Sequence, residues 1–235
     1  MNKRVYNGTI GKIIRTLGFL LVLVASVYLA TILILNPAHA DLPLIGNLVP
    51  FAQMADDLLS NVSFLNDTAY VYLSLTAGFI LMLWVIRKGV ILRVLLTVSL
   101  VAGFIFAAAS GQTLLAPVVF TSPVWLSSAL SSIDTLINQA LALSEFVVPG
   151  VYVATGVFLW ILFATKKPMR LSIFIFRLAT LAIFVAMLMN IVSSQFMTDL
   201  VTVDLYMTVQ ISLYLVSYLL FLGGSVFGVV GFARK

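Results

Sequence analysis

Six long, mostly apolar stretches separated by short polar segments dominate the hydrophobicity pattern of this chain. They cover residues 17–35, 68–86, 92–110, 147–165, 171–192 and 207–231. A helix needs about 20 apolar residues to cross a hydrocarbon core of about 30 Å, and each stretch is close to that length. Lipid offers the backbone no hydrogen-bond partners, so a spanning segment must satisfy its own amides as a helix. The pattern predicts an all-helical bundle of six transmembrane helices that forms one integral membrane domain over residues 1–235.

Two shorter segments, residues 51–65 and 123–143, alternate apolar and polar residues with the period of a helix. Each is predicted to be an amphipathic helix lying on the membrane surface. The polar face of the first is acidic, so we expect it to pack on protein or cap the bundle rather than bind anionic lipid. The second follows Thr121-Ser122-Pro123, and a hydroxyl residue before a first-turn proline is typical of a helix start.

Basic residues give the predicted bundle an orientation. All 13 Lys and Arg residues fall on one predicted side, and all 8 acidic residues fall on the other. Basic residues near the ends of spans mark the cytoplasmic side. The residues that anchor this topology are Arg87, Lys88, Arg93, Lys166, Lys167, Arg170 and Arg177. We therefore expect a bacterial or archaeal cytoplasmic membrane, cytoplasmic termini, and both amphipathic helices on the extracytoplasmic face.

Arg177 is a special case among the anchors, because it lies two turns inside the stretch 171–192. Its long stem can return the guanidinium group to the cytoplasmic interface.

The N-terminal region leaves two alternatives. A basic start, an apolar run, a proline and Ala38-His39-Ala40 are also the layout of a secretory signal peptide. The apolar run is longer than the roughly 7 to 15 residues of a signal core, which favours a retained first helix. Cleavage after Ala40 would leave five spans.

Composition excludes several classes of protein. The chain is 62% hydrophobic and 9% charged, against roughly 25% charged in soluble domains. The segments between spans are too short to form an independent core. The net charge is +5, but the basic residues lie at the ends of the predicted spans, so no nucleic-acid partner is expected. The absence of cysteine excludes disulfides and thiolate chemistry.

No catalytic, metal or cofactor motif stands out in the sequence. No ionisable residue is predicted near the membrane midplane, which argues against proton or sodium coupling through a carboxylate. His39 is the only histidine, and its nearest acid, Asp41, does not complete a ligand set. We expect neither an enzyme nor a bound cofactor.

Small residues spaced four apart predict close helix contacts, since they let helix backbones approach. These residues are Gly103, Ala107 and Gly111 in the third span and Gly224 and Gly228 in the sixth. Packing within the bundle and docking to other subunits both explain them. Docking is favoured most for Gly224 and Gly228.

Polar residues near the outer ends of the fifth and sixth spans also allow two interpretations. Asn190 and Gln210 can bond to each other across a helix interface, or can line a polar vestibule together with Tyr214. The interhelical bond is favoured, because such amide bonds commonly hold membrane helices together.

The order amphipathic helix, span, basic turn, span occurs twice. Asp57, Asn61 and Arg93 match Asp134, Asn138 and Arg170 at one constant offset. A parallel internal repeat and the general likeness of membrane hairpins both account for this pattern.

Together these features predict a non-enzymatic subunit of a larger membrane complex, such as secretion, conjugation or energy-transducing machinery. Its expected partners are the lipid bilayer and other membrane protein subunits. The alternative is a permease or channel for a small or apolar solute. Its path would run between the two hairpins, with Gln210 and Asn190 at the outer mouth.

Overall fold

A computed structural model describes residues 8–40, 42, 45–61, 67–86, 89–110, 121–132, 134–142, 144–164, 171–196 and 200–233. The regular elements in these residues are all helices. In chain order they are α2 (Thr9–Leu35), η1 (Pro37–His39), α3 (Val49–Leu59), α4 (Thr68–Ile86), α5 (Val90–Ser110), α6 (Val124–Ser131), α7 (Asp134–Ala142), α8 (Ser144–Phe163), α9 (Leu171–Phe196) and α10 (Leu200–Ala233).

The described chain is a multi-pass helical membrane protein. Five stretches are long and apolar enough to cross a bilayer: Thr9–Leu35, Thr68–Ile86, Val90–Ala109, Leu171–Met189 and Leu205–Gly231. The remaining predicted span, residues 147–165, falls on α8, whose described apolar part is the shorter Val153–Phe163. The sixth crossing therefore stays a prediction.

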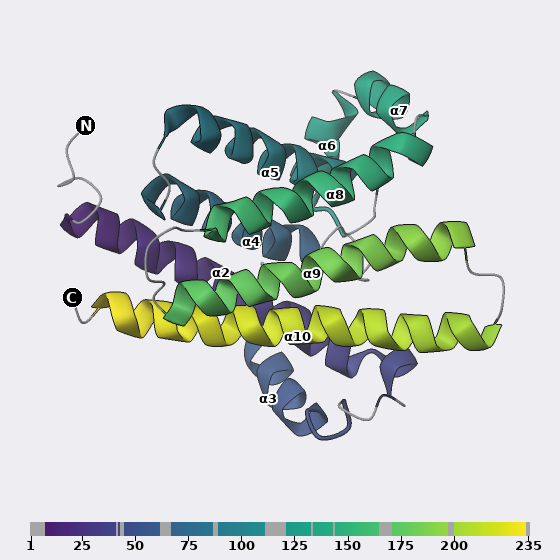
Figure 1. The fold of residues 1–235 in the computed structure, drawn as a ribbon, viewed down its shortest axis with the longest axis horizontal. Coiled ribbons are helices and arrows are strands. Elements are labelled where there is room, and N and C mark those ends of the chain that lie inside the picture. The colour runs from purple at the N-terminus through teal and green to yellow at the C-terminus, as the bar shows by residue number, and fades with distance from the viewer. Residues whose placement is uncertain are drawn as a thin grey trace.

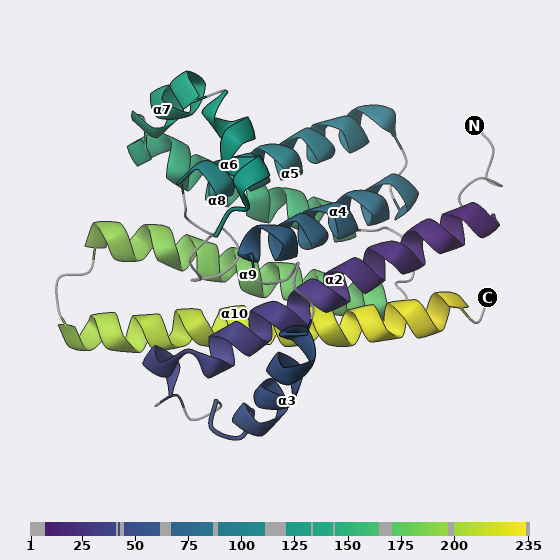
Figure 2. The same ribbon diagram turned by 180° about the vertical axis from the view of Figure 1, so that it is seen from behind.

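The long helices form a closed ring. Going round it, α2 packs on α4, α4 on α5, α5 on α8, α8 on α9, α9 on α10, and α10 back on α2. The start of α2 and the end of α10, the described residues nearest the chain termini, lie at one end of the bundle. The end of α4, the start of α5, the end of α8 and the start of α9 lie at the same end (Figure 1). Figure 2 shows α2 crossing in front of α10, and α3 packs on α2. The first and last helices are therefore neighbours.

The first helix begins about two turns before the predicted residue 17. Lys12 and Arg15 lie inside it, and Arg15 Nε donates to the Gly11 carbonyl at 3.2 Å. Basic residues with long apolar stems are good helix formers, so the helix extends past the apolar stretch instead of starting with it.

The first amphipathic helix, α3, is shorter than predicted. The Ser60 hydroxyl and the Asn61 side-chain Nδ2 both donate to the Asp57 backbone carbonyl, at 3.1 Å and 2.6 Å. These side chains compete for a carbonyl that a continuing helix would use, which ends the helix at Leu59. Residues 62–65 of the predicted helix lie outside the described residues.

The second amphipathic segment is two helices, so the prediction of one helix over residues 123–143 was wrong. The Ser131 hydroxyl donates to the Ser128 carbonyl at 2.7 Å, and the Ser132 amide donates to the Ala129 carbonyl at 3.3 Å. Serine hydroxyls compete with the helical hydrogen bonds, and the last turn tightens. The helix therefore stops at Ser131, and α7 begins at Asp134.

The two matched units have different surroundings. The helix α3 packs on α2, whereas α7 packs on α8 and α5. The order of elements repeats along the chain, but the packing of the amphipathic helices does not.

Candidate functional site: an aromatic centre, a cavity and two arginines

Five phenylalanines from five helices fill the centre of the ring at one level. Four of them make a closed cycle of ring contacts, with centroid separations of 6.1 Å from Phe79 to Phe163, 4.9 Å to Phe176, 5.2 Å to Phe221 and 5.5 Å back to Phe79. Phe19 of α2 meets Phe176 edge-on at 5.3 Å. All five side chains are buried. We call them the phenylalanine cluster.

The helices α2 and α4 touch backbone to backbone at two glycines. A Cβ atom on Gly78 would lie 2.9 Å from the Gly18 carbonyl oxygen and 2.7 Å from Val22 Cγ2. A Cβ atom on Gly18 would lie 3.0 Å from the Gly78 oxygen. Such close approach supplies the packing attraction that holds helices together in lipid. This pair was not predicted from the sequence.

Gly224 and Gly228 lie against the phenylalanine cluster. A Cβ atom on Gly224 would come within 2.5 Å of the Phe176 ring, and one on Gly228 within 2.7 Å of the Phe19 ring. Both glycines are therefore packed within this chain. The interpretation of the pair as a docking face for another subunit loses its support, because aromatic rings of α9 and α2 already cover that face.

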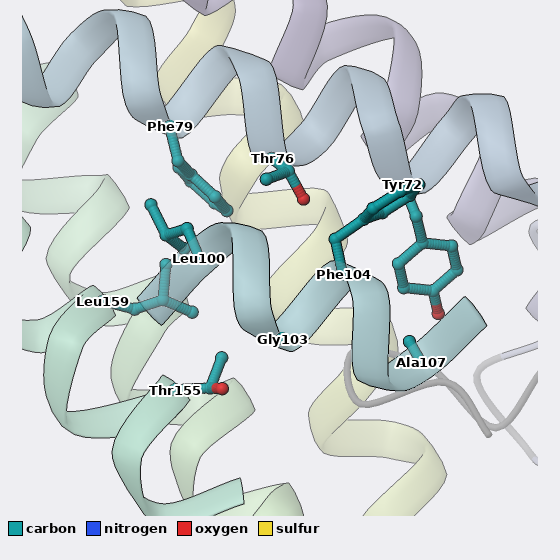
Figure 3. Close-up of a pocket in the computed structure, with 9 residues that line it drawn as sticks. All are labelled: Tyr72, Thr76, Phe79, Leu100, Gly103, Phe104, Ala107, Thr155 and Leu159. Atoms are coloured by element: carbon teal, nitrogen blue, oxygen red, sulfur yellow. The ribbon is translucent and has the colours of Figure 1, made fainter. Parts of the chain in front are cut away.

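Gly103 and Ala107 line a small cavity between α4, α5 and α8, of about 30 Å³. Tyr72 and Thr76 come from α4 and Thr155 from α8, while α5 with Gly103 runs between them (Figure 3). The other lining residues are Phe79, Leu100, Phe104 and Leu159. A cavity of this size holds roughly two water molecules, and threonine hydroxyls are available to them. Gly111 lies outside the described residues.

Two polar side chains of α10 donate hydrogen bonds to backbone carbonyls of α9. Gln210 Nε2 donates to the Ala186 carbonyl at 3.1 Å, and the Tyr206 hydroxyl donates to the Met189 carbonyl. Tyr214 is buried. Neither Gln210 nor Tyr214 lines the cavity described above. The side chain of Asn190, and with it the expected bond to Gln210, lies outside the described residues.

Arg93 is held by its own hairpin. Its guanidinium group is 5.2 Å from the centre of the Trp84 ring, and its Nη1 and Nε donate at 3.4 Å to the carbonyls of Trp84 and Gly89. Trp84 Nε1 donates to Thr97 Oγ1 at 3.0 Å, and the Thr97 hydroxyl donates to the Arg93 carbonyl at 2.7 Å. The side chain is buried within these contacts.

Arg177 has a different environment. Its guanidinium group lies 4.2 Å from the centre of the Trp160 ring. Among the residues that the structure describes, its buried Nε has no hydrogen-bond acceptor. The other predicted anchors, Arg87, Lys88, Lys166, Lys167 and Arg170, lie outside the described residues.

Thr121 caps a helix other than the one predicted. Its Oγ1 accepts a hydrogen bond from the Thr68 amide at 2.9 Å, and Thr68 Oγ1 accepts one from the Thr121 amide at 2.7 Å. This reciprocal pair caps the start of α4, while α6 begins after Pro123 without a side-chain cap. Nearby, Trp125 Nε1 donates to the Tyr70 hydroxyl at 2.9 Å.

His39 has a structural contact. Its Nδ1 is 2.9 Å from the Leu33 carbonyl oxygen, and the ring is buried at the end of α2. Within the described part of the chain, no group of three or more His, Cys, Asp or Glu side chains is placed to hold a metal ion.

Comparisons of the chain with models of protein families, with curated proteins and with solved structures each returned no match.

Proposed function

We propose that this protein is a non-enzymatic subunit of a larger complex in a bacterial or archaeal cytoplasmic membrane, with both termini cytoplasmic. Secretion-type or scaffold machinery is the class we favour. The observation that carries the proposal is the set of uncovered apolar side chains on the short helices outside the candidate spans.

These side chains are large and strongly exposed. On α3, Phe51, Met54 and Leu58 are 70%, 67% and 73% exposed. On the other side of the bundle, Val124 of α6 and Leu136 of α7 are 82% and 67% exposed. Exposed apolar residues on a spanning helix face lipid, whereas those on short helices outside the spans need the membrane interface or a protein as a cover. The polar face of α3 carries the exposed acids Asp56 and Asp57, which favours a protein over an anionic lipid surface. A neighbouring membrane subunit supplies that cover.

Two further features favour an assembly role over ion-coupled transport. The phenylalanine cluster fills the centre of the helix ring, and the five candidate spans contain no Asp or Glu. Carboxylates within the membrane are the usual carriers of proton or sodium coupling.

The cavity lined by Gly103 and Thr155 is the observation that favours the alternative, a permease or channel for a small or apolar solute. A path through it would have to displace Phe79, which belongs both to the cavity wall and to the phenylalanine cluster.

Purification in a mild detergent tests the proposal. We expect other polypeptides to accompany the chain in fixed stoichiometry, and Leu58→Gln or Leu136→Gln to release them without unfolding the chain. Gln53→Ala on α3 and Gln139→Ala on α7 are the matched controls, because they change exposed polar residues of the same helices. A lone monomer whose reconstituted vesicles move a solute would establish the alternative instead.

A further inference from the structure

Each hairpin of the bundle stacks one arginine on one tryptophan at the end where the termini lie. The α4 and α5 hairpin pairs Arg93 with Trp84, and the α8 and α9 hairpin pairs Arg177 with Trp160. The two pairs differ in what their donors meet. Arg93 reaches two backbone carbonyls, whereas the described surroundings of Arg177 provide the Trp160 ring and no acceptor for its Nε.

We propose that Arg177, stacked on Trp160, binds the phosphate group of an anionic phospholipid in the leaflet nearest the chain termini. This site goes beyond the proposed assembly role, since it would exist whether or not other subunits are present.

The charge of Arg177 needs an anion. The side chain stands on Leu171–Met189, a candidate span without Asp or Glu. A ring face attracts a guanidinium group only weakly compared with the cost of removing the charge from water. Guanidinium is planar and always protonated, and its donors match the oxygens of a phosphate group. The Nε atom itself is covered, but the Arg177 side chain as a whole is half-buried, so part of it is open to the surroundings. Phosphate is therefore the acceptor that best completes this site.

The depth of Arg177 suits a lipid headgroup. The residue is six positions after the start of α9, or about 9 Å along the helix. A long side chain on a helix leans toward the helix start, so the arginine stem covers most of that distance back to the headgroup level. The guanidinium group is thus expected where lipid phosphates lie.

The surface around Arg177 suits acyl chains. On α9, Phe174 and Leu178 are 46% and 41% exposed, and on α8 Val157, one turn before Trp160, is 39% exposed. These apolar side chains lie on candidate or predicted spans and flank the stacked pair along both helices. A phosphate with attached acyl chains therefore fits this surface better than free phosphate.

The test measures lipid retention by native mass spectrometry and the unfolding temperature in neutral detergent, using the whole chain. The additives are phosphatidylglycerol, phosphatidylcholine and inorganic phosphate. We expect the wild-type protein to retain phosphatidylglycerol and to be stabilised by it, more than by phosphatidylcholine or inorganic phosphate. Arg177→Gln should weaken phosphatidylglycerol binding by about tenfold or more, the usual effect of losing a charge-assisted contact.

Arg93→Gln is the matched control. It removes the same charge from the corresponding hairpin, and we expect it to bind phosphatidylglycerol like the wild type even where it lowers stability. Trp160→Leu keeps the charge but removes its platform, and should weaken binding by less than Arg177→Gln. If Arg177→Gln does not fold, Trp160→Leu and Arg177→Lys decide the matter, since both keep the positive charge and alter the geometry.

Three results would overturn the proposal. The first is unchanged phosphatidylglycerol binding by Arg177→Gln, or by both Trp160→Leu and Arg177→Lys. The second is an equal loss of binding in Arg93→Gln, which would indicate a general effect of charge. The third is equal stabilisation by inorganic phosphate, which would identify a free anion as the ligand. Because none of these measurements requires another polypeptide, they are independent of the test of the assembly role.

Discussion

The side of the ring built on α2 is packed far more tightly than the side built on α5. In the most apolar part of α2, 56% of the residues are buried, against 22% in α5. On the tight side Gly18 and Gly78 bring two backbones into contact. On the loose side Gly103 and Ala107 line a cavity instead.

The difference shows that small residues alone do not make a close helix contact. Lipid solvates apolar side chains as well as another helix does, so association depends on shape complementarity. Gly78 has Val22 and the Gly18 backbone fitted against it. Gly103 faces a space that its neighbours leave incompletely filled. A glycine on one helix therefore needs a matching surface on the next.

The largest effect is expected from Gly78→Leu, which places a side chain in the close contact between α2 and α4. Its first added atom would already meet a backbone oxygen at 2.9 Å, which no side-chain rotation relieves. We expect a loss of roughly 3 kcal/mol or more in the free energy of unfolding, measured by denaturation in mixed micelles. Gly223→Leu is the control, because a Cβ atom there meets nothing within 4 Å. Equal losses in both variants would contradict the close backbone contact between α2 and α4.

Phe176→Ala tests the phenylalanine cluster, because the Phe176 ring contacts three of the other four rings. We expect a loss of about 3 kcal/mol, at the low end for phenylalanine truncation because lipid also solvates an apolar ring. The same unfolding assay measures it. Phe174→Ala on the same helix removes a side chain that is 46% exposed, and should cost about 0.5 kcal/mol or less. The cluster would not be a stabilising centre if the two variants behaved alike.

The hydrogen-bonded pair of Thr68 and Thr121 joins the start of α4 to the segment before α6. Thr121→Val removes the acceptor for the Thr68 amide, and should cost about 1 kcal/mol. Thr121→Ser keeps the hydroxyl and should cost less than half as much. Hydrogen exchange at the Thr68 amide, which we expect to become faster only in Thr121→Val, locates the effect. Equal exchange in both variants would contradict the capping role.

The smallest effect is expected from Thr155→Val in the wall of the cavity. The change keeps the shape of the side chain and removes one hydroxyl, so a dry cavity predicts a shift within about 0.5 kcal/mol. A loss above about 1 kcal/mol would show that the hydroxyl holds a water or ligand there. Either result sharpens the contrast between the two sides of the ring.

Segments that are long and strongly apolar could be predicted from the sequence. The second span was expected at residues 68–86, and α4 is Thr68–Ile86. The break between α6 and α7 was missed, because the apolar stripe continues through Ser131 and Ser132 and outweighed their competing hydroxyls. The spacing of apolar residues indicates which face of a helix is apolar, whereas local hydrogen bonds determine the residue at which the helix ends.

The contacts between helices were harder to predict. Gly18 has no small residue four positions away on its helix, and Gly78 has only Ser74, so their meeting depends on which helices become neighbours. The same holds for the phenylalanine cluster, whose members come from five helices. The contrast between Arg93 and Arg177 also depends on their surroundings, because both look like interface anchors in the sequence.

The contact of α2 with α10 has a consequence for biogenesis. The ribosome delivers α2 well before α10, so α2 must wait in the membrane, with one flank temporarily uncovered, until α10 has been made. A nascent chain stalled before α10 would present Phe19 and its neighbours to lipid or to quality-control proteases. Removal of the region up to Ala40 would leave α4 and α10 without the helix they share.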